Sequence, residues 1–251
     1  MIESFKKHSM EPNRALKFLE NLDTPDQETN TLYLKKDSHP IEFKTIASKM
    51  AENFEYNSVQ ILKNLVNSLI GGGVLFWTET VYVLVVPPFP ITEEHRFEYK
   101  EIGPLRELLL KDRLVAALLL RLGRYAIGIF HGNQLISSKT DSYLVHSRHR
   151  KGGSSQARFA RRRIEQSNTF YRRACFVIEE KLAIYENDLE AVFLGGEKTT
   201  LEGFRRECRY LSRFNGKIPS RILNSREANQ KSLLKLPDLI LQSEIYLFNA
   251  N

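Results

Sequence analysis

Cysteine is scarce in this sequence of 251 residues, in which Cys175 and Cys208 are the only two. They lie far apart and in no ligand spacing, which argues against a disulfide framework and against a cysteine-based zinc site. We therefore expect both to be small buried apolar side chains in a reducing compartment.

Long hydrophobic runs are also missing. The longest, Val81 to Val86 and Val115 to Leu120, are far too short to cross a bilayer. The first stretch, Met1 to Arg14, is mixed polar and charged and lacks the apolar region of a secretion signal. His146 and His149 stand three residues apart without a nearby third ligand. We expect a soluble, cytoplasmic, monomeric protein that does not bind membranes and needs no metal or cofactor.

The first part of the chain predicts helices and strands in a mixed order. Residues 41–70 carry apolar side chains at helical spacing, and residues 74–77 and 81–86 are β-branched and aromatic, as in strands. Prolines at 87, 88 and 90 end the second strand, and residues 91–112 read as a connector. We therefore expect residues 1–112 to form a smaller N-terminal α/β region, whose role stays open.

The second part predicts an antiparallel sheet followed by helices. Apolar runs at 114–120 and 125–130 are separated by a glycine-containing turn, and after a second such turn residues 134–138 are expected to continue the sheet. From about 155 to 185 the period becomes helical, with one apolar stripe made of Ala160, Ile164, Tyr171, Ala174, Ile178 and Leu182. A short strand at 191–194 and a last strand at 240–248 complete the expected domain, residues 113–251. The predicted fold class is α+β, with a mixed or antiparallel sheet and packed helices.

Basic charge is concentrated in one segment. Between Arg148 and Arg173 nine residues are Lys or Arg and only Glu165 is acidic, a local charge of +8 against +7 for the whole chain. An ordinary solvated helix face interleaves both signs. The segment therefore predicts a phosphate-binding surface, which consists of Arg148, Arg150, Lys151, Arg158, Arg161, Arg162, Arg163 and Arg172.

A glycine loop precedes this helix. Gly152 and Gly153 permit backbone angles that other residues reach only with strain, and Ser154 and Ser155 can cap the helix. Gln156 then lies in the first turn, where free N–H groups and the positive end of the helix dipole favour an anion. Such a loop suits a site at which a carbonyl oxygen gains negative charge.

The run from Gly152 to Arg163 resembles the catalytic loop and helix of the Vms-like release factors, the VLRF family. These are relatives of the central domain of eukaryotic and archaeal class I release factors. Residues 124–132 resemble the family's glycine-rich hairpin, and residues 187–196 its later strand-to-helix turn. The resemblance covers roughly residues 113–248 and implies a release-factor central domain with RNase H-like topology.

The resemblance also implies an activity, the release of nascent chains from peptidyl-tRNA on stalled ribosomes or split large subunits. The ribosome, at its peptidyl-transferase centre, and peptidyl-tRNA would be the partners. Gln156 occupies the position of the key glutamine, and Gly152 and Gly153 those of the glycines. Ser154 and Ser155 separate them, in contrast to the Gly-Gly-Gln tripeptide of termination factors.

Two alternatives stay open at this stage. The same loop could support cleavage of the tRNA near its CCA end, with the ribose 2′-hydroxyl as nucleophile. The domain could also bind tRNA or the ribosome without catalysis. The presence of Gln156 favours a catalytic role.

Overall fold

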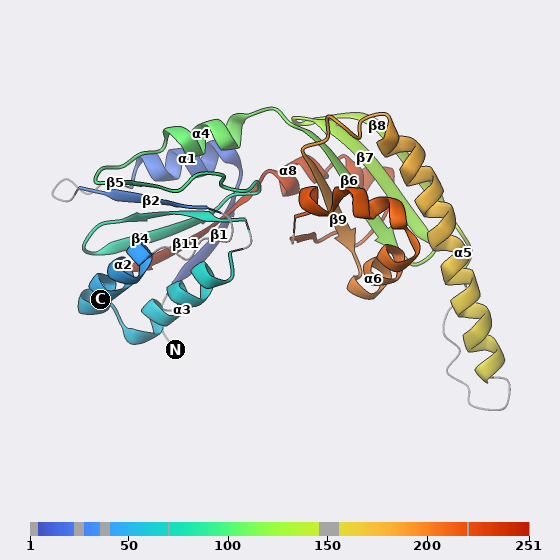
Figure 1. Ribbon diagram of the computed structural model, residues 1–251, viewed down its shortest axis with the longest axis horizontal. Helices are drawn as coiled ribbons and strands as arrows, with labels where there is room; N and C mark the ends of the chain where they lie inside the picture. Colours follow the sequence, from blue (N-terminus) through green and yellow to red (C-terminus); the bar gives the residue numbers. More distant parts are fainter. Residues whose placement is uncertain are drawn as a thin grey trace. The chain divides into compact units, whose positions relative to one another are not determined.

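The computed structural model describes residues 5–22, 28–35, 41–69, 71–145, 156–219 and 221–250. The chain forms two compact units (Figure 1). Unit 1 comprises Met1–Lys111 together with Leu241–Asn251, and unit 2 comprises Asp112–Ile240. Both units combine sheets and helices, as the α+β prediction required.

Unit 1 is built on a six-stranded antiparallel sheet with the order β1-β11-β4-β3-β2-β5. Three of its strands, β3, β4 and β11, match predicted ones. The strands are β1 (Lys6–Met10), β2 (Asn30–Leu34), β3 (Gly73–Trp77), β4 (Val81–Val86), β5 (His95–Phe97) and β11 (Ser243–Asn249). β1, β2 and β5 were not predicted. β1 and β5 are largely exposed strands at the sheet edges, and β2 begins with the polar residues Asn30 and Thr31, so none of them is a continuous apolar run.

Helices cover both faces of this sheet (Figure 1). They are α1 (Pro12–Glu20), α2 (Ile41–Asn53), α3 (Tyr56–Asn67) and α4 (Gly103–Leu110). Side chains alternate along each strand, so Leu75 and Leu84 join a core with α2 and α3. Val74 and Val85 join the opposite core with α1 and α4. Unit 1 thus has three layers.

The last strand corrects the expected extent of the second domain. We predicted that residues 113–251 would fold together, but β11 pairs with β1 and β4 of unit 1. Leu247 lies opposite Val83 on one side and Lys6 on the other. The chain therefore leaves unit 1 after Lys111 and returns to it at Leu241.

Unit 2 contains a five-stranded mixed sheet with the order β10-β9-β6-β7-β8. The strands are β6 (Leu114–Arg121), β7 (Arg124–His131), β8 (Gln134–Ser142), β9 (Ala191–Gly196) and β10 (Ile222–Leu223). The meander β6–β8 is antiparallel, whereas β9 runs parallel to both β6 and β10. This is the RNase H-like topology that the family resemblance implied.

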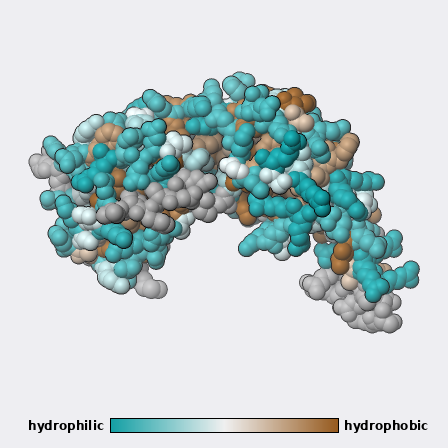
Figure 2. Space-filling view, viewed as in Figure 1, coloured by the Kyte–Doolittle hydropathy of each residue, from teal (hydrophilic) through white to brown (hydrophobic). Residues whose placement is uncertain are grey.

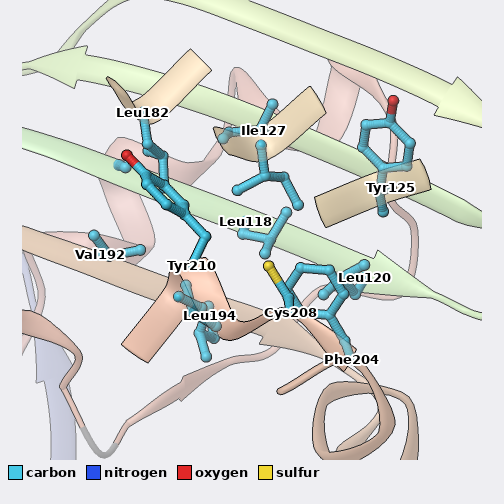
Figure 3. Close-up of a cluster of buried hydrophobic side chains, with 14 of the residues drawn as sticks. Leu118, Leu120, Tyr125, Ile127, Leu182, Val192, Leu194, Phe204, Cys208 and Tyr210 are labelled. Carbon is cyan, nitrogen blue, oxygen red and sulfur yellow. The ribbon is translucent and has the colours of Figure 1, made fainter. Parts of the chain in front are cut away.

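The core of unit 2 lies between this sheet and its long helix. The helices are α5 (Gln156–Ala183), α6 (Lys198–Glu207), the 3-10 helix η1 (Arg209–Lys217), α7 (Gln230–Leu233) and α8 (Leu236–Ile240). Figure 3 shows how β6, β7 and β9 contribute Leu118, Ile127 and Leu194 to this core, against Phe204 of α6 and Cys208. Because α5 anchors here, its position on the sheet is fixed by apolar burial.

No helix in the described part of the chain is long and apolar enough to span a membrane.

Candidate RNA-binding and catalytic site

The helix α5 has two parts with different environments. Its C-terminal half packs on the sheet through a row of buried side chains, Phe170, Tyr171, Ala174, Ile178 and Leu182. Its first turns run past the end of the sheet (Figure 1). With 28 residues the helix is about 42 Å long, at roughly 1.5 Å per residue.

The predicted apolar stripe is therefore only partly correct. Tyr171 is buried as expected, but Ala160 is exposed and Ile164 is 60% exposed. Both keep the helical phase of the buried row, yet they lie in the first turns of α5, which run past the end of the sheet (Figure 1). Helical phase alone therefore does not decide which positions of α5 are buried.

The arginines of α5 present an unneutralised surface. Arg158, Arg161, Arg162 and Arg172 are exposed, and Arg163 is half-buried. Within the described residues, no ion pair joins any of these five side chains to a carboxylate. Hydrophilic side chains cover most of the helix in Figure 2. Unpaired guanidinium groups along one helix are suited to phosphate oxygens.

One outward row of α5 consists of Arg158, Arg162, Glu165, Thr169 and Arg172, spaced three or four residues apart. We call it the arginine row. The Thr169 hydroxyl donates a hydrogen bond to the Glu165 carbonyl oxygen at 2.9 Å, which turns it toward the helix backbone. The arginines are thus the longest unpaired groups of this row.

The catalytic loop of the prediction lies mostly outside the described residues. This applies to Gly152, Gly153, Ser154 and Ser155, and also to the three basic residues before them, Arg148, Arg150 and Lys151. Gln156 is described in its backbone and is the first residue of α5. Free N–H groups and the positive dipole end therefore occur at Gln156, as the sequence predicted.

A second basic segment was missed in the sequence. Arg205 and Arg206 of α6 and Arg209 of η1 are exposed. The signal was present as an Arg-Arg-x-x-Arg spacing near the end of a helix, but charge counting was dominated by residues 148–173. The structure packs α6 directly against α5.

Tyr171 lies at this contact between the two helices. Burial raises the pKa of its phenol, and the nearby Arg206 and Arg163 act in the opposite direction. The Thr200 hydroxyl, which donates to the Glu197 carboxylate at 3.1 Å, also acts to lower the pKa of this phenol. Arg163 of α5 and Arg206 of α6 therefore both lie near the buried Tyr171, so the two basic segments are close to each other at this point.

Metal-binding residues were not expected, and the two histidines considered, His146 and His149, lie outside the described residues. Among the residues that are described, no three His, Cys, Asp or Glu side chains form a group that could hold a metal ion.

The comparison with known families covers the same part of the chain. A family model described as Actinobacteria/chloroflexi VLRF1 release factor matches residues 113–245, more than half of the sequence. The chain belongs to the VLRF1 release factor family. The match contains the whole of α5 and the Gly-Gly-Ser-Ser sequence before it.

Curated relatives of this VLRF1 family member include archaeal release factors. Peptide chain release factor subunit 1 of Archaeoglobus fulgidus is 28% identical over 117 residues, which are 47% of this chain and 29% of that protein. Subunit 1-1 of Methanosarcina acetivorans is 32% identical over 125 residues, 48% of this chain and 30% of that protein. The chain thus matches less than a third of the length of these relatives.

Among solved structures, the chain is similar to an archaeal translation termination factor, with a TM-score of 0.38 and 13% identity over 92% of this chain and 71% of the other. It is also similar to Dom34 of S. cerevisiae, with a TM-score of 0.31 and 10% identity over 94% of this chain and 66% of the other.

The hairpin that carried part of the VLRF resemblance forms β7 and the turn into β8. Gly132 has a φ of 55° in this turn, and a side chain there would meet the Asp112 carboxylate. Gly128 lies in the middle of β7, where a Cβ would meet the ring of Phe130. The glycines of this VLRF motif are therefore required by turn conformation and by close packing.

The two cysteines correct an expectation. We predicted two independent apolar side chains and no disulfide, but Cys175 and Cys208 form a disulfide with a Cα–Cα distance of 5.3 Å. Cys175 is on α5 and Cys208 follows α6 directly, so the bond ties the arginine-bearing helix to its neighbour. Their separation of 33 residues concealed the pairing, because only the packing of α5 on α6 brings them together.

Proposed function

We propose that this VLRF1 family member is a ribosome-associated peptidyl-tRNA hydrolase that frees nascent chains from stalled ribosomes or large subunits. The position of Gln156 carries the proposal. It opens a 28-residue helix that projects beyond its domain, directly after a Gly-Gly-Ser-Ser sequence and directly before unpaired arginines. The first turn of a long cationic helix that extends beyond its domain is suited to reach into an RNA-walled site.

The reaction we propose is hydrolysis of the ester that joins the nascent chain to the tRNA. Water attacks the ester carbonyl, the tetrahedral intermediate collapses, and the ribose 3′-oxygen leaves with a proton. The Gln156 backbone N–H would donate to the developing oxyanion, while its side chain positions the water. One such donor contributes roughly 10²–10³ in rate, a few kcal/mol.

The remaining acceleration would come from orientation of the tRNA end in the peptidyl-transferase centre. In this proposal Gly152 and Gly153 allow the loop backbone to approach the ester closely, and Ser154 and Ser155 present Gln156. The arginines of α5, with Arg148, Arg150 and Lys151 before the loop, bind RNA phosphates. The protein would act as a cytoplasmic monomer, without a cofactor.

The test uses purified ribosome–nascent-chain complexes. Wild type should convert peptidyl-tRNA to free peptide, and Gln156→Ala should slow release by about 10²-fold or more. Gln134→Ala is the matched control, since Gln134 is an exposed glutamine of the same unit. Release by Gln156→Ala at the wild-type rate would refute a catalytic loop and leave a binding role.

The 3′ end of the released RNA separates the two possible bond cleavages. Ester hydrolysis leaves an intact CCA end. A shortened end would instead establish nuclease action by the same loop.

A further inference from the structure

The arginine row ends in an exposed aromatic ring. Phe176 follows Arg172 by four residues and so continues the same helical row toward the C-terminal end of α5. Its side chain is 64% exposed. Within the described residues no other ring packs against it, although fully burying such a side chain is favourable by about 1.5–3 kcal/mol.

Opposite charges flank this ring on its two sides along the helix. Arg172 and Arg173 precede it by one turn, whereas Glu179 and Glu180 follow it by one turn, and all four are exposed. A phosphate is therefore favoured before the ring and disfavoured after it. The charges along this face of α5 therefore favour a polyanion up to Phe176 and not beyond it.

Arg173 is held in place beside the ring. Its guanidinium lies over the ring of Tyr143, 4.9 Å from the ring centroid. Tyr143 follows β8, and its N–H donates to the carbonyl oxygen of Gly123 at 2.8 Å. A strand end therefore positions one of the two cations next to Phe176.

The size of the apolar surface indicates its occupant. The neighbours of Phe176 one turn away are charged on both sides, so along this face of α5 the exposed apolar surface is a single ring. A protein partner needs a larger apolar core to bind stably. A nucleobase, by contrast, is a single flat ring system attached to a phosphate, which matches a ring beside arginines.

We propose that Phe176 stacks on an unpaired base of the RNA whose phosphates bind the arginine row. This inference rests on the RNA-binding part of the proposed function. The base must be unpaired, because the bases of a duplex are already stacked on one another. Phe176 is thus assigned as a base-binding residue that ends the RNA path along α5.

The experiment measures the affinity of the full chain for a labelled single-stranded RNA and for a duplex of the same length. Phe176→Ala should weaken binding of the single strand by about 5- to 100-fold, the usual range for loss of one stacked base. The duplex should bind equally to wild type and variant. The dependence of affinity on salt should stay the same, because no charge is removed.

A matched control and a gain-of-signal variant complete the test. Ile184 is 72% exposed and directly follows α5, so Ile184→Ala removes a comparable exposed apolar group away from the row and should leave affinity unchanged. Phe176→Trp should retain affinity, and its indole fluorescence should be quenched when the single strand binds. Trp77, the only natural tryptophan, is buried in unit 1 and provides a constant background.

Three results would overturn the inference. They are wild-type affinity of Phe176→Ala for the single strand, an equal loss for the duplex, and unchanged fluorescence of Phe176→Trp at saturating RNA. The assay contains no nascent chain, so it is independent of ester hydrolysis. A protein that loses single-strand affinity through Phe176→Ala but releases no peptide keeps this inference and loses the proposed activity.

Discussion

Tyr171 of α5 lies against Gly203 of α6 so closely that a Cβ on Gly203 would come within 2.9 Å of three atoms of the phenol side chain. The contact requires the absence of a side chain at residue 203. It sets how closely the arginine-bearing helix approaches its neighbour, and the disulfide between Cys175 and Cys208 joins the same two elements.

Substitution at Gly203 should therefore separate α5 from α6. Alanine favours helices by about 1 kcal/mol over glycine, but overpacking typically costs about 1–3 kcal/mol. We expect Gly203→Ala to lower the free energy of unfolding of unit 2 by about 1 kcal/mol net. Denaturant unfolding measures this. Gly216→Ala is the control, since a Cβ there meets nothing within 4 Å, and equal stability of both variants would contradict the close contact.

The disulfide should stabilise unit 2 measurably. It closes a loop of 33 residues, for which chain entropy alone gives roughly 3–4 kcal/mol. Reduction with a thiol, or Cys175→Ser, should lower the unfolding midpoint of unit 2 and leave unit 1 unaffected. A thiol titration of the native protein that finds two free thiols would contradict the bond itself.

Periodicity and turn residues in the sequence predicted the elements whose contacts are made between residues close together in the chain. The periodicity of residues 155–185 predicted α5 almost to its ends, and the turns of residues 114–138 predicted the meander β6–β8. The excess of Lys and Arg in residues 148–173 also indicated that the basic residues of α5 lie together on one helix. These features depend on neighbours within a few turns or on adjacent strands, which the sequence order reveals.

Features that depend on distant contacts were not predictable in this way. Ile164 has the phase of a core residue, but periodicity cannot reveal where the sheet beneath a helix ends. β11 follows unit 2 in sequence but pairs with β1 and β4. Arg206 acquires its place beside α5 only through the packing of Tyr171 on α6. In each case the partner lies far away in the sequence.

Alkaline pH should destabilise unit 1 through Tyr82. Burial raises the pKa of its phenol to about 12, and the ring packs edge-on against Phe54 with centroids 5.1 Å apart. The neutral form is thus favoured in the folded state, so its contribution is complete below pH 10 and is lost as pH rises toward 12. A pKa difference between 10 and about 12 corresponds to a loss of about 3 kcal/mol.

Tyr82→Phe should make the stability of unit 1 less dependent on pH between 10 and 12. Unfolding curves at several pH values measure this, with Tyr56→Phe as the control because Tyr56 is 75% exposed. A steeper decline in Tyr82→Phe than in wild type would contradict the assignment.

The arginine row should dominate the affinity for RNA. Arg158 and Arg162 are exposed and one turn apart, so reversing both to glutamate changes the local charge by four and replaces phosphate attraction with repulsion. We expect ribosome and tRNA association to fall by at least about 10²-fold, and the salt dependence of the remaining binding to become shallower. Folding should be retained, since neither side chain has a partner carboxylate within the described residues. The control is the double variant Lys44→Glu and Lys49→Glu, which changes the net charge by the same amount on the exposed surface of α2. If that double variant lost RNA affinity as strongly, binding would depend on total charge and not on the surface of α5.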